Sequence, residues 1–258
     1  MNILATIAAR AGSKGVKSKN IREFLGWPLC AYTLSAYRMF LQRYASESDC
    51  FDLAVNTDSA ELFAQLDQTG TRYLKIPRKD ELAGDTAAKT DVIRDTLAIA
   101  EDLTGRTYDA VLDMDLTSPL RRAKDIKNIL DAFFENDGAE IALSLTESRR
   151  NPYFNQLIRG DDGFFHIAIN GGFVARQQAP EVFDANASLY VYSPVFLRGG
   201  TKKLHDAKLA ASFMKDTAVL DIDSEHDFEL LSLLADYFYR TDREFGEVRE
   251  HIESFIQK

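Results

Sequence analysis

The sequence predicts an α/β fold, in which helices pack against a mostly parallel sheet. Strand-like apolar runs alternate with helical stretches through the first half of the chain. The chain has 258 residues, of which 45% are apolar, enough to bury one large core. Alternation of this kind is typical of parallel sheets, because each helix carries the chain back to start the next strand. We therefore expect a single domain over residues 1–258.

Short runs rich in Val, Ile, Leu and Tyr mark the expected strands. In chain order these runs cover residues 3–9, 51–57, 72–76, 108–114, 141–146, 187–193 and 217–223. Apolar residues at helical spacing predict helices at 28–44, 59–68, 89–103 and 123–136, with two more after the last strand. In such a sheet, ligands gather at the carboxyl ends of the strands.

The pattern changes between about residues 149 and 186. The stretch NPYFNQLIRGDDGFFHIAI predicts a hairpin around Gly160–Gly163, and a polar segment rich in Gly and Gln follows it. A hairpin does not fit the alternation on either side. We expect an excursion that leaves the sheet and returns with the strand at 187–193.

Composition excludes several classes of protein. The formal net charge is −9, with 31 Lys and Arg against 40 Asp and Glu, which disfavours binding to nucleic acid. No apolar run reaches the roughly 18 residues of a membrane span, and no signal-peptide pattern follows Met1, so we expect a cytoplasmic protein. Cys30 and Cys50 are too few for a disulfide scaffold, and the four His lack partners at zinc-ligand spacing.

A concentrated positive charge follows the first strand, in IAARAGSKGVKSKNI at 7–21. Five cations fall within thirteen residues that contain no carboxylate: Arg10, Lys14, Lys17, Lys19 and Arg22. Backbone N–H groups of a glycine-containing loop and nearby cations together can hold a polyphosphate. The loop has neither G-x-x-x-x-G-K-[ST] nor G-x-G-x-x-G, so it is neither a P-loop nor a dinucleotide fingerprint. A solvated basic loop is the alternative.

The stretch AARAGSKGVKSKNI resembles the N-terminal signature of the acylneuraminate cytidylyltransferases. VNTDS (55–59), RKDELAGDTA (78–87), LTSPLR (116–121) and DIDSEHDFEL (221–230) are similar to further family motifs, in the family's order. The resemblance covers nearly the whole chain. It implies a Rossmann-like, GT-A-like nucleotidyltransferase fold that joins CTP to a 2-keto-3-deoxy sugar acid and releases pyrophosphate. It also implies a homodimer built around the β-rich excursion at 149–186.

The resemblance also assigns roles to individual residues. Arg10, Ser13, Lys14, Lys19 and Asn20 would form the nucleotide loop, Arg78 would help to hold the nucleotide, and the backbone of Ala87 would recognise cytosine. Among these, Arg10, Lys14 and Lys19 would be catalytic. Negative charge grows on the departing pyrophosphate, and positioned cations stabilise it.

Paired aspartates near the C-terminus predict a metal site. Nucleotidyl transfer needs a hard divalent cation, Mg²⁺ or Mn²⁺, held by few carboxylates and by the phosphates. Asp221 and Asp223 lie two apart on an expected strand, so both carboxylates face one side, and the family uses the matching pair for metal. A purely structural alternative is that Ser224 and its neighbours only cap the next helix.

A second pair, Asp113 and Asp115, departs from the sialic-acid members, which commonly have Gln where Asp115 stands. Together with RNPYFN and APEVFDANASLYVY, this departure makes the chain more similar to the subgroup that activates legionaminic acid, a di-N-acylated relative of sialic acid. The pair could contact the sugar, bind metal as a D-x-D, or pack. Arg176, Asn186 and Tyr190 match sugar-contacting positions, although Tyr190 could equally be a core residue.

Two other kinds of function stay open from sequence. A nucleotide-sugar-dependent glycosyltransferase would share the fold and the D-x-D but would not need five cations on its first loop. A non-catalytic nucleotide-binding protein would be expected to have lost one of the basic or acidic site residues, and all of them are present. Pseudaminic acid and KDO are alternative sugar acids for the same reaction.

Overall fold

The structure, a computed structural model, describes residues 1–12, 15–16, 18–84, 87–200, 203–215 and 221–256. Its central sheet has seven strands: β1 (Asn2–Ala8), β4 (Cys50–Thr57), β5 (Leu74–Pro77), β6 (Ala110–Met114), β7 (Ile141–Glu147), β10 (Phe183–Tyr192) and β11 (Leu209–Phe213). Their order is β11-β7-β10-β6-β1-β4-β5, and neighbours are parallel except where β10 meets β6 and β7. The predicted α/β fold with a mostly parallel sheet is confirmed.

The four helices between the strands agree with their predicted ranges to within one residue. They are α1 (Leu29–Tyr44), α2 (Ala60–Asp67), α3 (Lys89–Thr104) and α4 (Ala123–Glu135). The two expected C-terminal helices are α6 (Glu225–Thr241) and α7 (Arg243–Ile252), and α6 begins with the Ser224–Asp227 capping box. A short helix, α5 (Pro194–Gly199), and a small hairpin of β2 (Glu23–Phe24) and β3 (Trp27–Pro28) complete this part of the fold. Among the described residues, no helix is both long and apolar enough to cross a bilayer.

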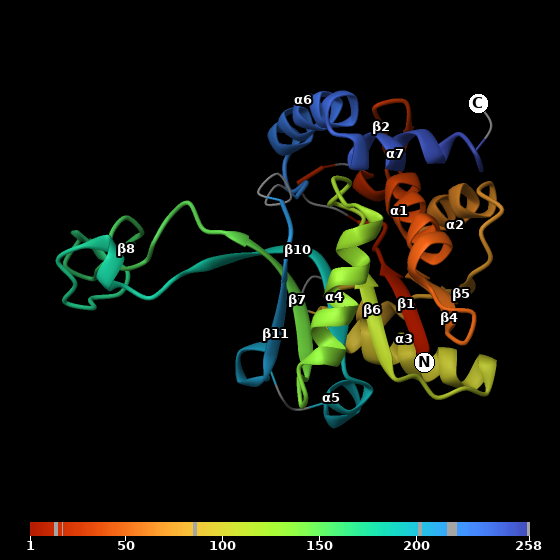
Figure 1. Cartoon of the computed structure of the whole chain (residues 1–258), viewed down its shortest axis with the longest axis horizontal. Helices are drawn as coiled ribbons and strands as arrows, with labels where there is room; N and C mark the ends of the chain where they lie inside the picture. Colours follow the sequence, from red (N-terminus) through yellow and green to blue (C-terminus); the bar gives the residue numbers. More distant parts are fainter. Residues whose placement is uncertain (13–14, 17, 85–86, 201–202, 216–220, 257–258) are drawn as a thin grey trace.

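The sheet is buried on both faces, as the run of apolar residues in β1 requires. Ile3, Ala5 and Ile7 belong to one core cluster with buried residues of α1, α2 and α4. Leu4, which points to the other face, packs in a cluster with residues of α3 and α5. A third cluster joins α6 and α7 to the start of α1, so the C-terminal helices lie beside the carboxyl end of β1 (Figure 1).

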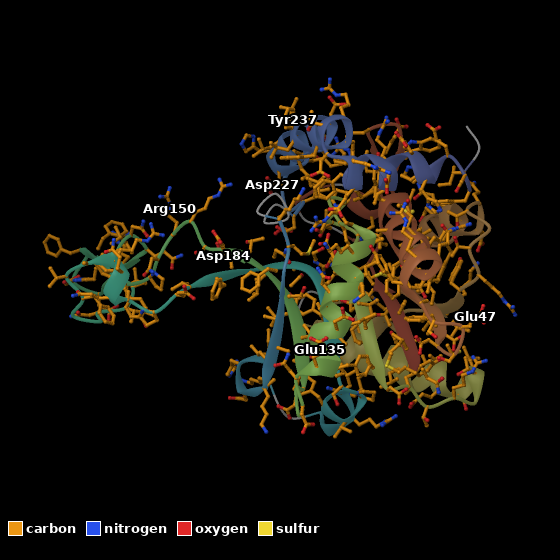
Figure 2. All side chains as sticks on the ribbon, in the orientation of Figure 1. Glu47, Glu135, Arg150, Asp184, Asp227 and Tyr237 are labelled. Carbon is orange, nitrogen blue, oxygen red and sulfur yellow. The ribbon has the colours of Figure 1, made fainter. Side chains whose placement is uncertain are left out.

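An arm, residues 148–182, projects from the sheet between β7 and β10 (Figure 1). Its strands β8 (Leu157–Arg159) and β9 (Phe165–Ile167) form the predicted hairpin, with Gly163 at a φ of 85° in the turn. Figure 2 shows Arg150 on the arm and Asp184 close to where the chain rejoins the sheet. The returning strand begins at Phe183, earlier than predicted, because Phe183–Ala185 pair with Leu145–Glu147 and lengthen the sheet towards the arm.

The last predicted strand, at 217–223, is wrong where it can be judged. Residues 221–223 form no strand, and 217–220 lie outside the described residues. The edge position is occupied instead by β11, which pairs with β7 over Leu209–Phe213. Its sequence LAASF is short and contains Ala and Ser, which have little strand preference of their own, so pairing with β7 decides its conformation.

Candidate active site

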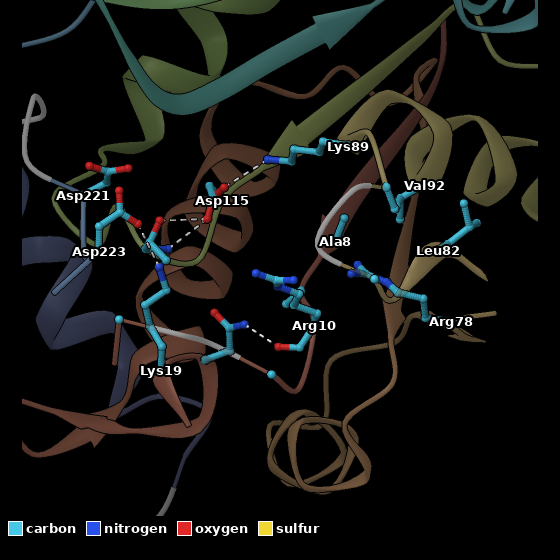
Figure 3. A pocket seen from close by; sticks show the side chains of 17 residues that line it. Ala8, Arg10, Lys19, Arg78, Leu82, Lys89, Val92, Asp115, Asp221 and Asp223 are labelled. Atoms are coloured by element: carbon cyan, nitrogen blue, oxygen red, sulfur yellow. Dashed lines mark hydrogen bonds and ion pairs between the residues drawn. The ribbon is translucent and has the colours of Figure 1, made fainter. Parts of the chain in front are cut away.

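The largest concentration of the predicted site residues lies in one pocket of about 490 Å³. The pocket opens where β1, β5 and β6 end, the position expected for ligands in a parallel sheet. Eight predicted residues line it: Arg10, Lys19, Asn20, Arg78, Ala87, Asp115, Asp221 and Asp223 (Figure 3). The structure thus brings together side chains that are up to 213 positions apart in the sequence.

Two arginines meet on one side of the pocket. Arg78 follows β5, and its guanidinium donates to the side-chain Oδ1 and the backbone oxygen of Asn56, both at 2.9 Å. Burial lowers the pKa of Arg78, nearby Asp58 raises it, and the neighbouring charge of Arg10 lowers it again. Figure 3 shows both side chains directed to the same part of the pocket. Bringing two guanidinium groups together costs energy that an anionic ligand offsets, so this side of the pocket suits phosphate.

The VNTDS motif supports this arginine pair. Asn56 is fully buried and holds Arg78, while its amide nitrogen donates to Thr96 on α3 at 2.9 Å. Asp58 accepts a 2.6 Å hydrogen bond from the backbone N–H of Ala11, which fixes the start of the basic loop. Ser59 caps α2 by accepting from Leu62 N–H. The motif therefore positions the loop and Arg78 and does not itself line the pocket.

The basic loop is in direct contact with the acidic segment around Asp221 and Asp223. Lys19 Nζ donates to the backbone oxygen of Ile222 and lies 3.3 Å from Asp223 Oδ1. A Cβ built on Gly15 would lie 1.6 Å from the backbone oxygen of Asp223, so only glycine allows this approach. The Lys19 side chain is 14% exposed. The alternative of a solvated basic loop is therefore wrong for Lys19, because its ammonium group is held against residues 222–223.

The two aspartates have the chemistry of a divalent-cation site. Both line the pocket (Figure 3), and burial together with the neighbouring charge of Asp223 raises the pKa of Asp221. Two close carboxylates that repel each other suit a hard cation, which lowers the energy of both. Among the described residues no group of three or more acidic, Cys or His ligands is found, so a metal here would need phosphate or water oxygens as further ligands.

The other acidic pair is already occupied by a lysine. Asp113 is fully buried at the end of β6, where Oδ1 accepts from the Thr6 hydroxyl at 2.9 Å. Its Oδ2 lies 2.7 Å from Lys89 Nζ, which also lies 3.0 Å from Asp115 Oδ2. Asp115 Oδ1 accepts from both the backbone N–H and the hydroxyl of Thr117. Lys89 thus lies against both carboxylates, although Asp113 Oδ2 receives no well-aligned hydrogen bond from the described residues. The charge of the lysine at this position disfavours a metal ion between the same two carboxylates.

Charge effects keep Lys89 and Asp115 ionised. Burial would raise the pKa of Asp115, but Lys89 and the hydrogen bonds from Thr117 hold it well below its usual value. Burial would lower the pKa of Lys89, but Asp113 and Asp115 raise it well above its usual value. Arg121, which is 1% exposed, donates to the backbone oxygens of Asp115 and Ser188 at 2.7 and 2.6 Å. Thr117 and Arg121 of the TSPLR segment therefore hold the side chain and the backbone of Asp115 in place.

Three of the predicted site residues that the structure describes do not line the pocket. Two more, Ser13 and Lys14, lie outside the described residues. Arg176 lies on the arm beside a separate surface pocket. Asn186 is 2% exposed, and its Oδ1 accepts from the Ser144 hydroxyl at 2.5 Å. Tyr190 packs on Tyr192, with its ring 5.4 Å from Lys89 Nζ. Sugar contact by Arg176, Asn186 or Tyr190 stays a prediction, and in this arrangement Asn186 acts as a strand-to-strand link.

Sequence reasoning missed Lys89 and Thr117, which both line the pocket. One signal was available for Lys89. It is the first residue of α3, where the positive end of the helix dipole disfavours a cation. A lysine at such a position needs an anionic partner, and the aspartates at 113 and 115 were the candidates.

Comparison with known proteins now defines the class. The model of the cytidylyltransferase family matches residues 4–188, and the chain belongs to this family, whose activity is CTP-dependent nucleotidyl transfer. Among curated proteins, the flagellin modification protein B of Campylobacter coli is 35% identical over 90% of this chain and 94% of its own. The CMP-N,N'-diacetyllegionaminic acid synthase of Campylobacter jejuni is 32% identical over the same shares. The N-acylneuraminate cytidylyltransferase of Escherichia coli is 28% identical over 88% of this chain and 51% of its own.

Solved structures agree on the fold. A CMP:2-keto-3-deoxy-manno-octonic acid synthetase complexed with CTP superposes with a TM-score of 0.65 at 12% identity, covering 92% of this chain and 99% of that one. The 4-diphosphocytidyl-2C-methyl-D-erythritol synthase of Anaerococcus prevotii gives 0.57 at 13% identity, with 91% and 98% covered. At these identities the likeness concerns the fold alone, and it confirms a nucleotidyltransferase fold.

Proposed function

We propose that the protein transfers CMP from CTP to a nonulosonic acid of the legionaminic type and releases pyrophosphate. The observation that carries the proposal is the pocket that joins the basic loop, Arg78 and the Asp221–Asp223 pair at the ends of the parallel strands. The similarity to the legionaminic acid synthase of Campylobacter jejuni supports this class of sugar acid. A glycosyltransferase is disfavoured by the family to which the chain belongs.

The geometry supports direct attack of the sugar hydroxyl on the α-phosphate of CTP. Arg10 and Arg78 would hold phosphate oxygens from one side, and Lys19 would face them from the side of the acidic segment. As the bond to pyrophosphate breaks, these cations stabilise the charge that grows on the leaving oxygen. Because Asn56 holds Arg78 and the backbone oxygen of Ile222 holds Lys19, these two cations need little reorganisation.

We infer that Asp221 and Asp223 hold the divalent cation, Mg²⁺ or Mn²⁺. When bound, such an ion neutralises phosphate charge and orients the triphosphate. The position of the carboxylates next to Lys19, together with the raised pKa of Asp221, supports this assignment. The Asp113–Asp115 pair is the weaker candidate, because Lys89 already satisfies it.

We also propose a homodimer formed through the arm. Exposed apolar side chains gather on it, including Leu157, Phe164 and Phe165 at 58%, 71% and 66% exposed. Apolar groups at such density suit a buried interface. In a dimer Arg176 of one arm could serve the pocket of the second subunit, which would reconcile its sugar-binding assignment with its place on the arm.

The function is tested by incubating the protein with CTP, Mg²⁺ and single sugar acids. The panel contains N,N'-diacetyllegionaminic, N-acetylneuraminic and pseudaminic acids and KDO, and CMP-sugar is detected by mass. We expect the highest kcat/KM with the legionaminic acid. Product only with KDO, or none with any acid, would refute the proposal.

The dimer is tested by light scattering after size-exclusion chromatography. We expect Phe165→Glu, on the arm, to yield monomers. The matched control is Val195→Glu on α5, where an apolar residue that is 76% exposed, against 66% for Phe165, lies outside the arm and the change should leave the dimer intact. A wild-type monomer at micromolar concentration would contradict this part of the proposal.

A further inference from the structure

Lys89 is a partly buried cation of the pocket that has no role in the proposed phosphate chemistry. It begins α3, lines the pocket beside Asp115, and lies on the side of β6 and β10 rather than with Arg10 and Arg78 (Figure 3). Its side chain is 35% exposed, so part of it faces the pocket. The distances to Asp113 and Asp115, 2.7 and 3.0 Å, fix the position of the ammonium group.

The ammonium group has one donor more than these partners require. Lys has three N–H groups. One donates to Asp115 Oδ2, and Asp113 Oδ2 lies 2.7 Å from Nζ without a well-aligned hydrogen bond, so the two carboxylates take at most two of the three donors. The ring centroid of Tyr190 lies 5.4 Å from Nζ, which is too far for a hydrogen bond, and among the described residues Nζ donates only to Asp115. At least one N–H of Lys89 therefore has no acceptor among the described residues and is available to a ligand in the pocket that Lys89 lines.

The charge around Lys89 decides what kind of ligand this donor suits. Lys89, Asp113 and Asp115 together carry one net negative charge, and buried Arg121 behind Asp115 brings the cluster to neutrality. A neutral cluster gives no net attraction to a carboxylate or phosphate. Its free N–H matches a neutral oxygen, such as an acyl carbonyl or a hydroxyl.

We propose that Lys89, held in place by Asp113 and Asp115, donates a hydrogen bond to a neutral acyl or hydroxyl oxygen of the sugar acid and so helps to select the sugar. This inference rests on the proposed function, since it names a contact of the same site. It also assigns the acidic pair a role: Asp113 and Asp115 position the lysine and bind neither metal nor sugar directly. Asp115 acts on sugar choice through Lys89.

The test compares three variants with the wild-type enzyme. Lys89→Met keeps the length of the stem and removes the donor, but it leaves two carboxylates, of which Asp113 is fully buried, without their cation and could unfold the site. Lys89→Met combined with Asp115→Asn removes that excess charge. Lys79→Met is the matched control. Like Lys89, Lys79 forms an ion pair with an aspartate, in its case Asp95 on α3, but it lies outside the pocket. Thermal unfolding of each variant is recorded beside kcat and KM for CTP and for the sugar acid, and the half-saturating Mg²⁺ concentration.

We expect the sugar-acid KM to rise about 10- to 100-fold in the double variant, as loss of one charged hydrogen bond predicts. The KM for CTP and the Mg²⁺ requirement should stay within about twofold of wild type, and the Lys79→Met control should be unchanged. A double variant with wild-type sugar kinetics would overturn the proposal, because Lys89 would then serve only to neutralise the carboxylates. A rise in the CTP KM instead would assign Lys89 to the nucleotide, and a raised Mg²⁺ requirement would return the acidic pair to the metal.

The wild-type assay separates this inference from the proposed function. If the wild-type enzyme forms CMP-sugar and the double variant keeps wild-type sugar kinetics, only the role of Lys89 is refuted. If the wild-type enzyme forms no CMP-sugar with any acid of the panel, the proposed function fails, and the Lys89 contact fails with it.

Discussion

Replacing Gly15 by alanine tests whether the basic loop must lie against the acidic segment for catalysis. The new Cβ would start 1.6 Å from the backbone oxygen of Asp223 and 2.8 Å from its carbonyl carbon. Contacts under 3.0 Å essentially do not occur, so loop and segment must separate by about 1.4 Å. Both obstructing atoms belong to the backbone, which cannot rotate away as a flexible side chain could.

A separation of this size displaces Lys19 and Asp223 from the positions in which they would act on the triphosphate and its metal ion. A misplacement of about 1 Å costs roughly 10²-fold in rate, so we expect kcat to fall about 100-fold. The half-saturating Mg²⁺ concentration should rise as well, because Asp223 moves. Gly15 itself is exposed, and we expect the melting temperature to fall by no more than about 4 °C, equivalent to roughly 1 kcal/mol.

The assay is pyrophosphate release at saturating CTP, with thermal unfolding of the same samples. Gly199→Ala is the control, since a Cβ at Gly199 would meet nothing within 4 Å and the residue lies at the end of α5, outside the pocket. If Gly15→Ala turned over at the wild-type rate, the close approach of loop and segment would be irrelevant to the reaction. The reasoning would then be refuted.

Three further outcomes follow from the charges of the site. Lys19→Met should lower kcat about 10²- to 10³-fold in the pyrophosphate assay, as expected for a donor to developing charge, and should also lower the melting temperature by a few degrees because its contact with Ile222 is lost. Asp221→Asn should abolish Mg²⁺-dependent turnover yet raise the melting temperature in EDTA, since it removes a carboxylate that burial and Asp223 disfavour; a lower melting temperature would contradict this. The pKa of Asp221 is raised in the native state without metal. At pH values just above the usual carboxylate pKa, the native state therefore binds more protons than the unfolded state. The free energy of unfolding of the wild-type protein consequently falls as pH rises through that window. The stability advantage of Asp221→Asn should therefore grow as pH rises from about 4, which urea unfolding at several pH values measures.

Local sequence patterns determined most of the fold. The helices at 28–44, 59–68, 89–103 and 123–136 were predicted to within one residue, because apolar periodicity and helix-start residues are local properties. The basic loop could be chosen from its run of cations and the pair Asp221 and Asp223 from its spacing, whereas Arg78 was assigned through the resemblance to the acylneuraminate cytidylyltransferases. The basic loop and Arg78 share one pocket because β1 and β5 end at the same edge of the parallel sheet, whereas Asp221 and Asp223 line it from a segment that forms no strand.

Only the tertiary structure decided which charges meet. Lys89 and Asp113 are distant in sequence, and no local pattern states that one ammonium group lies between the carboxylates of Asp113 and Asp115. The strand at 209–213 likewise exists because β7 offers a partner, and its own residues carry little preference for it. Local propensity acts between near neighbours in the chain. Ion pairs, the pairing of an edge strand and the close approach of Gly15 to Asp223 depend instead on distances between remote segments. Those distances are set only when the whole sheet has assembled.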